Sequence, residues 1–223
     1  MKKPATLTRT GPRAAGSPGF TLVELLVVIV IIVTLAAATF AISTSVLTKS
    51  RLNASIGKVR DLGIRVESYS QDNGGVLPVY HDTAQDLYWW GMLVKDEKNE
   101  SELEIFKSPG DKRFDLKKVR DTVSYGWNAH VCGRSEDAQG GEGPQRKNSF
   151  KDPTNILVLV DGPKNGGQGL FDEANTPDPK RYGGKAAALM LDGSGKTLNV
   201  ETEFKAGSKW FLTEAEREAK GMH

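Results

Sequence analysis

The stretch that decides the fold is GFTLVELLVVIVIIVTLAAATFAI, residues 19–42. It opens on a Gly-Phe junction, carries one carboxylate at Glu24, and is followed by no charged residue from Leu25 to Thr48. As an α-helix, residues 25–48 would be about 36 Å long, enough to cross a hydrocarbon core of about 30 Å. We therefore predict a transmembrane helix over residues 20–48, and no other stretch of the sequence is long and apolar enough for that role.

The residues that precede this stretch are basic. Residues 1–19 carry Lys2, Lys3, Arg9 and Arg13 and no acidic residue. Because basic flanks of a first membrane helix stay in the cytoplasm, we expect a cytoplasmic N-terminus with the bulk of the chain outside. Without this leader, 26 basic side chains face 28 acidic ones. That balance does not favour binding of nucleic acid through charge.

The order G-F-T-L-V-E-L-L over residues 19–26 resembles the class III signal of type IV pilins and type II secretion pseudopilins. The resemblance implies that a prepilin peptidase removes the leader, residues 1–19, by cutting the bond between Gly19 and Phe20. It implies that the new amine of Phe20 is methylated. It also implies a single-pass protein of the inner membrane that later joins a periplasmic or surface filament with further copies and other pilin-like subunits.

Glu24 is the one charge in an otherwise apolar run. A charged side chain costs up to about 2.5–3.5 kcal/mol at the centre of a membrane helix and less near its end, so Glu24 points to a partner charge. The amine of Phe20 in a neighbouring subunit would be such a partner, and the pair would set the register between subunits. The alternatives are a Glu that reaches water, a plain anchor, and a secretory signal cut near residues 35–38.

Residues 49–223 are long enough for one extracytoplasmic domain with its own core. The helix is predicted to continue to about Tyr69, because QDNGG at 71–75 and Pro78 then stop it. Four strands are predicted after the helix, at residues 122–128, 156–160, 186–191 and 196–200. The last two are expected to form a hairpin around a turn at Asp192-Gly193. A capping box at Thr213–Glu216 is expected to open a short C-terminal helix. Loops are predicted over 133–149 and 161–184. The fold class is therefore α+β: a long N-terminal helix, half in the membrane and half packed, on a small antiparallel sheet, pilin-like, with long loops.

Several other residues have both a structural and a functional interpretation. The aromatic residues Tyr80, Tyr88, Trp89 and Trp90 are expected to form a core cluster beneath the helix, with a stacking surface for a ligand as the alternative. His81-Asp82 is expected to lie in a surface turn rather than to bind a metal. Cys132, the only cysteine, is expected to be a small buried residue and allows no internal disulfide.

A second resemblance covers the C-terminal half. Tyr182, nine residues and then Asp192-Gly193 look like the signature His, nine residues, Asp-Gly of a large bacterial group of prepilin-like proteins. That group also tends to carry a Cys-Pro turn and a Ser-Tyr-Gly-x-Asn segment, and the second of these is present here at residues 124–128. Tyr182 replaces the His and Ser108 replaces the Cys, which weakens a metal or catalytic role for the motif.

The chemistry of the sequence favours a structural role. We find no nucleophile elbow, no phosphate-binding glycine motif and no zinc-ligand spacing, so an enzyme is not predicted. No cofactor is predicted either, although a calcium site is an alternative, with ligands from Asp161, Asp172, Glu173 and Asp178. The prediction is a structural subunit of a type II secretion pseudopilus or a type IV pilus-like filament. The alternative is a single-pass, membrane-anchored, extracytoplasmic binding domain that uses the aromatic residues.

Overall fold

The computed structural model describes residues 19–135, 143–163 and 166–222. Its first element, α1, runs from Leu22 to Asp72 and is 51 residues long, which confirms the predicted long helix. The turn after Asp72 contains Gly74 and Gly75 with φ of 63° and 87°, so the predicted stop signal acts where expected. The chain divides into two compact units, Met1–Thr44 and Ser45–His223, and each is described by itself.

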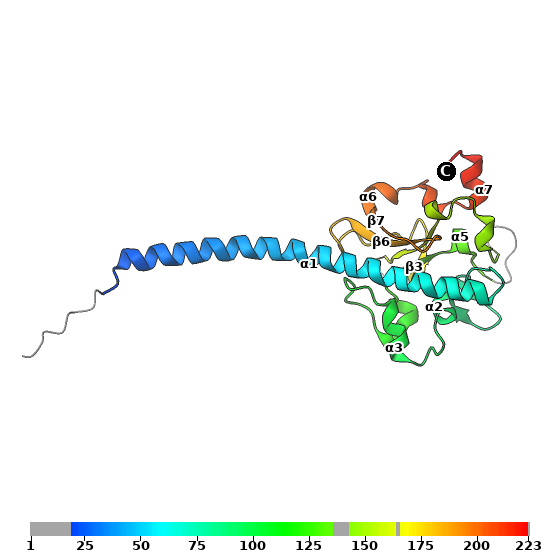
Figure 1. The fold of residues 1–223 in the computed structure, drawn as a ribbon, viewed down its shortest axis with the longest axis horizontal. Coiled ribbons are helices and arrows are strands. Elements are labelled where there is room, and N and C mark those ends of the chain that lie inside the picture. The colour runs from blue at the N-terminus through cyan, green and yellow to red at the C-terminus, as the bar shows by residue number, and fades with distance from the viewer. Residues whose placement is uncertain (1–18, 136–142, 164–165, 223) are drawn as a thin grey trace, which may run out of the picture. The chain divides into compact units, whose positions relative to one another are not determined.

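The second unit contains a five-stranded sheet in the order β5-β3-β4-β6-β7. All neighbours pair antiparallel except β3 and β5, which are parallel. A separate two-stranded antiparallel ribbon is formed by β1 and β2. Together with α1 this is the predicted α+β fold (Figure 1). The strands are β1 His81–Asp82, β2 Leu87–Tyr88, β3 Tyr125–Asn128, β4 Leu157–Asp161, β5 Leu170–Phe171, β6 Lys185–Met190 and β7 Gly195–Asn199.

The remaining described helices are short. The α-helices are α2 Trp89–Met92, α3 Glu100–Leu103, α4 Val119–Thr122, α5 Ala129–Cys132, α6 Val200–Glu203 and α7 Glu214–Ala219. The 3-10 turns are η1 Glu104–Phe106, η2 Leu116–Lys118, η4 Lys147–Ser149, η5 Pro153–Asn155, η6 Gly167–Gly169 and η7 Lys209–Phe211. The predicted capping box opens α7, because Glu216 Oε2 accepts from the Thr213 amide at 2.8 Å while Thr213 Oγ1 accepts from the Glu216 amide at 3.3 Å.

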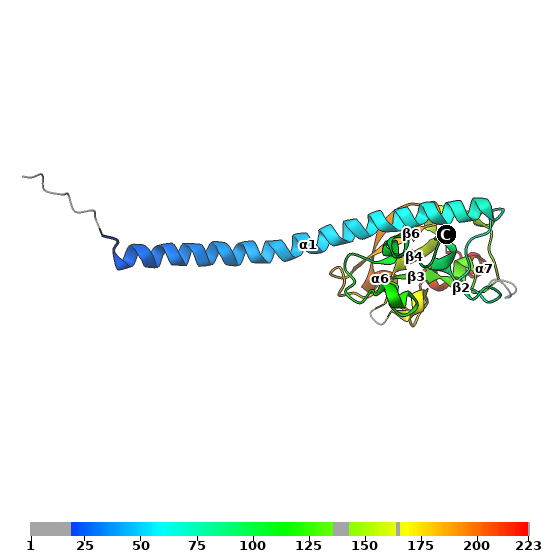
Figure 2. The same ribbon diagram turned by 90° about the horizontal axis from the view of Figure 1, so that it is seen from below.

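The second half of α1 covers one face of the sheet (Figure 2). Strand β6 alternates, so Ala187 and Leu189 belong to the same hydrophobic cluster as the buried residues of α1. Ala188 and Met190 belong to a second cluster on the other face, with Trp210 and Phe211. The buried residues of α1 in the first cluster are Leu52, Val59, Leu62 and Val66. This helix is therefore part of the core of the domain and not an addition to it.

Gly63 lets α1 and β6 approach closely. A Cβ atom at Gly63 would lie 2.7 Å from Cδ1 of Leu189, closer than two carbon atoms can come without movement. The same test at Gly57, on the same helix, finds no atom within 4 Å. A side chain at position 63 would thus require Leu189 to move, whereas one at position 57 would displace nothing.

The predicted hairpin is confirmed, since β6 and β7 pair around a turn in which Gly193 has φ of 84°. The predicted loop over 161–184 is wrong in part, because Asp161 ends β4 and Leu170–Phe171 forms the parallel edge strand β5. The predicted loop over 133–149 includes residues 136–142, which lie outside the described residues.

Candidate functional site

The predicted cleavage site lies immediately before α1. Gly19 and Phe20 are outside the helix, and 80% of the Phe20 surface is exposed. A Cβ atom at Gly19 would meet no atom within 4 Å. Gly19 and Phe20 are thus both exposed outside α1. Cleavage there and methylation of Phe20 stay predictions, and residues 1–18 of the leader lie outside the described residues.

Glu24 has a partner within its own chain. Its Oε2 accepts hydrogen bonds from the amide and the hydroxyl of Thr21, both at 2.8 Å. In return, Thr21 Oγ1 accepts from the Glu24 amide at 3.2 Å. This is a capping box, which satisfies amide groups that the first turn of a helix leaves unpaired. Thr21 was not among the predicted site residues, although Thr-x-x-Glu is the same signal that predicts the capping box at Thr213.

The capping box changes how the charge of Glu24 is understood. Thr21 and Glu24 both follow the predicted cut, so the mature chain would keep the box. A single helix therefore already stabilises this carboxylate with two short hydrogen bonds. A partner amine from another subunit would have to compete with these bonds or add to them, because the carboxylate has further lone pairs.

The first part of α1 exposes an apolar surface. The large apolar side chains from Phe20 to Leu35 are between 44% and 80% exposed. Among the described residues, α1 is the one helix long and apolar enough to cross a membrane, judged by length and composition. Soluble proteins rarely expose so large an apolar patch, so this surface fits lipid or the helices of other subunits.

The predicted aromatic core cluster is confirmed for the two tryptophans. Trp89 and Trp90 are buried, and Trp89 stacks on Trp127 with 5.1 Å between ring centroids. Tyr88 is half-buried, and its ring stacks on His81, with 4.2 Å between ring centroids, and on Trp90, with 4.7 Å between ring centroids. Because both neighbours engage the Tyr88 ring, little of it is free to stack on a ligand.

The predicted surface turn is wrong for His81 and Asp82, because they form strand β1, Asp82 is buried, and the turn follows at residues 83–86. Asp82 Oδ1 accepts from the amides of Ala84 and Gln85 at 2.9 and 3.1 Å, and His81 Nε2 lies 2.9 Å from Asp86 Oδ1. Cys132 is fully buried, as predicted. Burial raises the pKa of its thiol, so it stays protonated and unreactive.

The structure brings together residues that the sequence did not connect. Ser108 Oγ lies 2.5 Å from the hydroxyl of Tyr182 and donates to Asp161 Oδ1 at 2.9 Å. Ser55, from α1, donates to the same oxygen at 3.2 Å and lies 3.3 Å from the hydroxyl of Tyr125. All five residues are buried. Tyr182, which stands in place of the His, and Ser108, which stands in place of the Cys of the Cys-Pro turn, thus touch each other in one polar cluster.

Arg181 supplies the positive charge beside this cluster. Its guanidinium lies 3.6 Å from Asp161 Oδ1 and 3.1 Å from Asp111 Oδ2. The Ala187 amide also donates to Asp161 Oδ2, at 2.6 Å. Burial nevertheless raises the pKa of Asp161 above its ordinary value. The hydrogen bond from Ser55 to Asp161 joins α1 to the sheet. Because the groups of the cluster are buried, a substrate has no access to them.

Each of the four carboxylates considered as calcium ligands accepts hydrogen bonds from its own partners. Asp161 belongs to the buried cluster, and Asp172 Oδ1 accepts from the amides of Ala174 and Asn175. Glu173 accepts from the Gly207 amide, and Asp178 accepts from the Lys180 amide. No group of three or more His, Cys, Asp or Glu side chains that could hold a metal occurs within the described ranges. The calcium site stays a prediction from the sequence alone.

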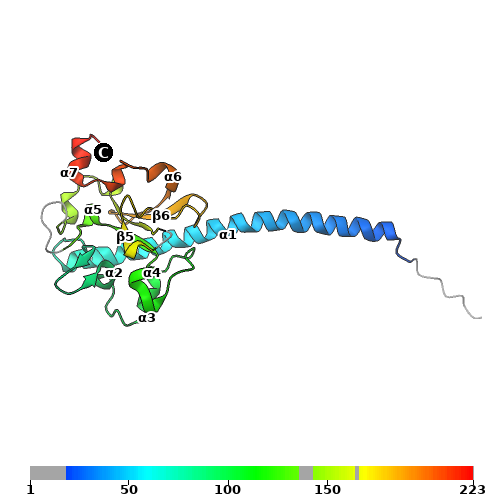
Figure 3. The same cartoon turned by 180° about the vertical axis from the view of Figure 1, so that it is seen from behind.

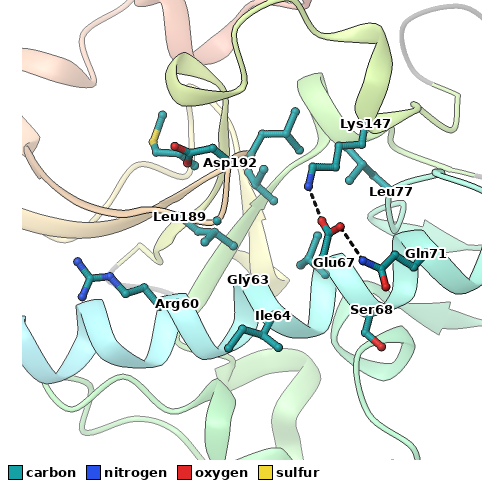
Figure 4. Close-up of a pocket in the computed structure, with 15 residues that line it drawn as sticks. Arg60, Gly63, Ile64, Glu67, Ser68, Gln71, Leu77, Lys147, Leu189 and Asp192 are labelled. Carbon is teal, nitrogen blue, oxygen red and sulfur yellow. Dashed lines mark hydrogen bonds and ion pairs between the residues drawn. The ribbon is translucent and has the colours of Figure 1, made fainter.

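A cavity of about 450 Å³ lies between α1 and the turn of the β6–β7 hairpin (Figure 4). Leu77 and Leu189 are among the residues that line it. On its wall, Glu67 is bonded to Gln71 Nε2 at 3.0 Å and ion-paired with Lys147. Asp192, which also lines the cavity, accepts from the amide and hydroxyl of Ser194, as expected of a turn residue. These polar groups already have partners, so the cavity shows no reactive constellation.

Comparison with known protein families supports the interpretation of the N-terminal segment as a class III signal. A family model described as the prokaryotic N-terminal methylation motif matches residues 16–40. No curated protein and no solved structure matches the chain. The chain therefore carries the class III signal of type IV pilin-like proteins, followed by a long N-terminal helix. The motif and the apolar helix fit a pilin-like prepilin that crosses the inner membrane once.

Proposed function

We propose that this chain is a structural subunit of a pilus-like filament, cut between Gly19 and Phe20, methylated at Phe20 and assembled through α1. The observation that carries the proposal is the methylation motif at residues 16–40, because it coincides with the start of a helix whose apolar surface is exposed. The described domain offers packing and buried polar contacts rather than an open reactive site, which favours a structural role over an enzyme.

Within this class, we favour a pseudopilin of a type II secretion pseudopilus over a pilin of a type IV pilus. The support is the single cysteine, since many pilins close a C-terminal loop with a disulfide and this chain cannot. An assignment to one machine follows if the chain co-purifies with the subunits of that machine after crosslinking in its native cells.

Mass spectrometry of the mature N-terminus tests the proposed processing. The expected first residue is N-methylated Phe20, with residues 1–19 absent. A Gly19→Leu variant should keep its leader, because a Cβ atom at Gly19 meets no atom within 4 Å and the substitution should therefore act on recognition by the peptidase rather than on the fold. An intact leader on the wild-type chain, or a chain that begins at Thr39, would overturn the proposal.

Glu24 is the residue we propose to set the register between subunits. A Glu24→Leu variant should insert in the membrane and be cut normally but should form few filaments, as counted by electron microscopy. Insertion is preserved because the substitution removes a charge from an apolar helix. Filaments of normal number and length in this variant would rule out the register role.

A further inference from the structure

Four exposed basic residues lie on two segments of the second unit, its first residues of α1 and the segment around Gly183 that leads into β6. Lys49 and Arg51 lie on α1, immediately after the charge-free stretch. Lys180 and Lys185 flank Gly183, and a Cβ atom at Gly183 would lie 4.0 Å from Cγ2 of Thr48. The yellow-to-orange loop that leads into β6 lies beside α1 at this end of the domain (Figures 1 and 3). We call Lys49, Arg51, Lys180 and Lys185 the basic collar.

The charges of the basic collar are not neutralised by the domain itself. None of the four takes part in an ion pair among the described residues. The carboxylate of Asp178 is directed to the Lys180 amide, and it is half-buried. An exposed acid, Glu201, lies two residues after Asn199, the residue of β7 that is paired with Lys185. The collar therefore presents a net positive charge to solvent.

The chain holds this charge close to the end of the proposed membrane span. Lys49 follows Thr48 directly, and at about 1.5 Å per residue Arg51 lies only about 5 Å farther along α1. Lipid head groups occupy roughly 5–8 Å on each side of the hydrocarbon core. Attraction of Lys and Arg to an anionic surface extends over about 8–10 Å at moderate salt. The cations on α1 are thus within reach of head-group phosphates.

We propose that the basic collar binds anionic phospholipid head groups on the outer surface of the membrane and holds the unassembled domain against the bilayer. This inference rests on the proposed membrane insertion of residues 20–48 and adds a second contact to it. The bound partner is the lipid surface, because single phosphate ions would not engage cations spread over a helix and a loop. Assembly into a filament would have to release this contact.

Lysine acylation of the full chain in nanodiscs tests the proposal without changing the sequence. Labelling of Lys49, Lys180 and Lys185 is measured by peptide mass spectrometry in phosphatidylcholine discs and in discs with equal parts of phosphatidylcholine and phosphatidylglycerol. Lys98 and Lys220 are exposed and serve as internal controls. In the anionic discs the collar lysines should be protected several-fold, and high salt should remove the protection. Free glycerol phosphate with neutral discs should not protect them.

A pair of charge-matched variants completes the test. Replacing Lys180 and Lys185 by Gln should reduce the ratio of docked to free domain about 25-fold at low salt, since each cation near an anionic surface contributes about fivefold. In this double variant, the protection of Lys49 from acylation measures the ratio of docked to free domain. Replacing Lys98 and Lys220 by Gln should leave it unchanged.

The outcomes separate this inference from the proposed function. A chain that enters the discs but shows equal labelling of collar and control lysines overturns the lipid contact alone. A chain that does not enter the discs overturns the membrane anchor and the contact with it. Protection that is equal in neutral and anionic discs also overturns the contact, because simple proximity to the bilayer would then explain it.

Discussion

At Glu24, two roles for one carboxylate can be separated experimentally. The capping box uses the Thr21 hydroxyl, whereas the proposed register contact uses an amine of another subunit. A Thr21→Ala variant loses the hydroxyl but keeps the Thr21 amide, and should cost the first turn of α1 about 1 kcal/mol. We expect a smaller loss of filaments for Thr21→Ala than for Glu24→Leu, counted by electron microscopy in the same cells. Equal losses would show that Glu24 acts through the cap.

Tyr182 shows how one hydroxyl can hold several segments together. It accepts from the Gly110 amide at 2.9 Å and contacts Ser108, so Tyr182→Phe would leave both groups without that partner. The expected loss is about 1–3 kcal/mol in the free energy of unfolding, measured with denaturant on the detergent-solubilised chain. Tyr80→Phe is the matched control, because its hydroxyl bonds to Gln168 at an exposed site. A loss at Tyr182 no larger than at Tyr80 would contradict the importance of the buried cluster.

The two glycines of α1, Gly57 and Gly63, test how this helix packs on the sheet. Gly57→Ala should stabilise the domain by up to about 1 kcal/mol, because alanine is the better helix former and the new methyl meets no atom within 4 Å. Gly63→Ala should destabilise it, because its methyl would overlap Leu189 and push β6 from α1. Thermal unfolding of the two variants side by side measures both signs. Stabilisation by both substitutions would mean that Leu189 moves aside without cost.

Elements with strong local signals could be predicted from the sequence. Helix α1, its stop at Gly74-Gly75, and the hairpin turn at Asp192-Gly193 each follow from charge, glycine or periodicity within a short window. Strand β5 could not be predicted, because two residues are too few to show an alternation. It exists only because β3 is there to pair with it.

The polar cluster around Asp161 could not be predicted from the sequence for a different reason. Its members come from distant segments, with Ser55 and Asp161 separated by 106 positions. Taken one at a time, serine and aspartate are most often exposed. Ser55 and Asp161 become neighbours only when α1 packs on the sheet, so no local sequence pattern predicts their burial. The processing segment shows the opposite case, because its whole signal lies within residues 19–26.

For the whole molecule, the division at Thr44 predicts which part folds alone. A chain of residues 45–223 should be soluble and should unfold cooperatively, because it keeps every residue of both described core clusters. A chain of residues 73–223 should not fold. It loses Leu52, Val59, Leu62 and Val66, whose burial contributes about 6–12 kcal/mol in total, comparable with the whole stability of a domain. Circular dichroism during heating distinguishes the two chains. A cooperative transition in residues 73–223 at the temperature of the longer chain would show that α1 is only attached to the domain, and the assembly helix could then detach from it without unfolding the sheet.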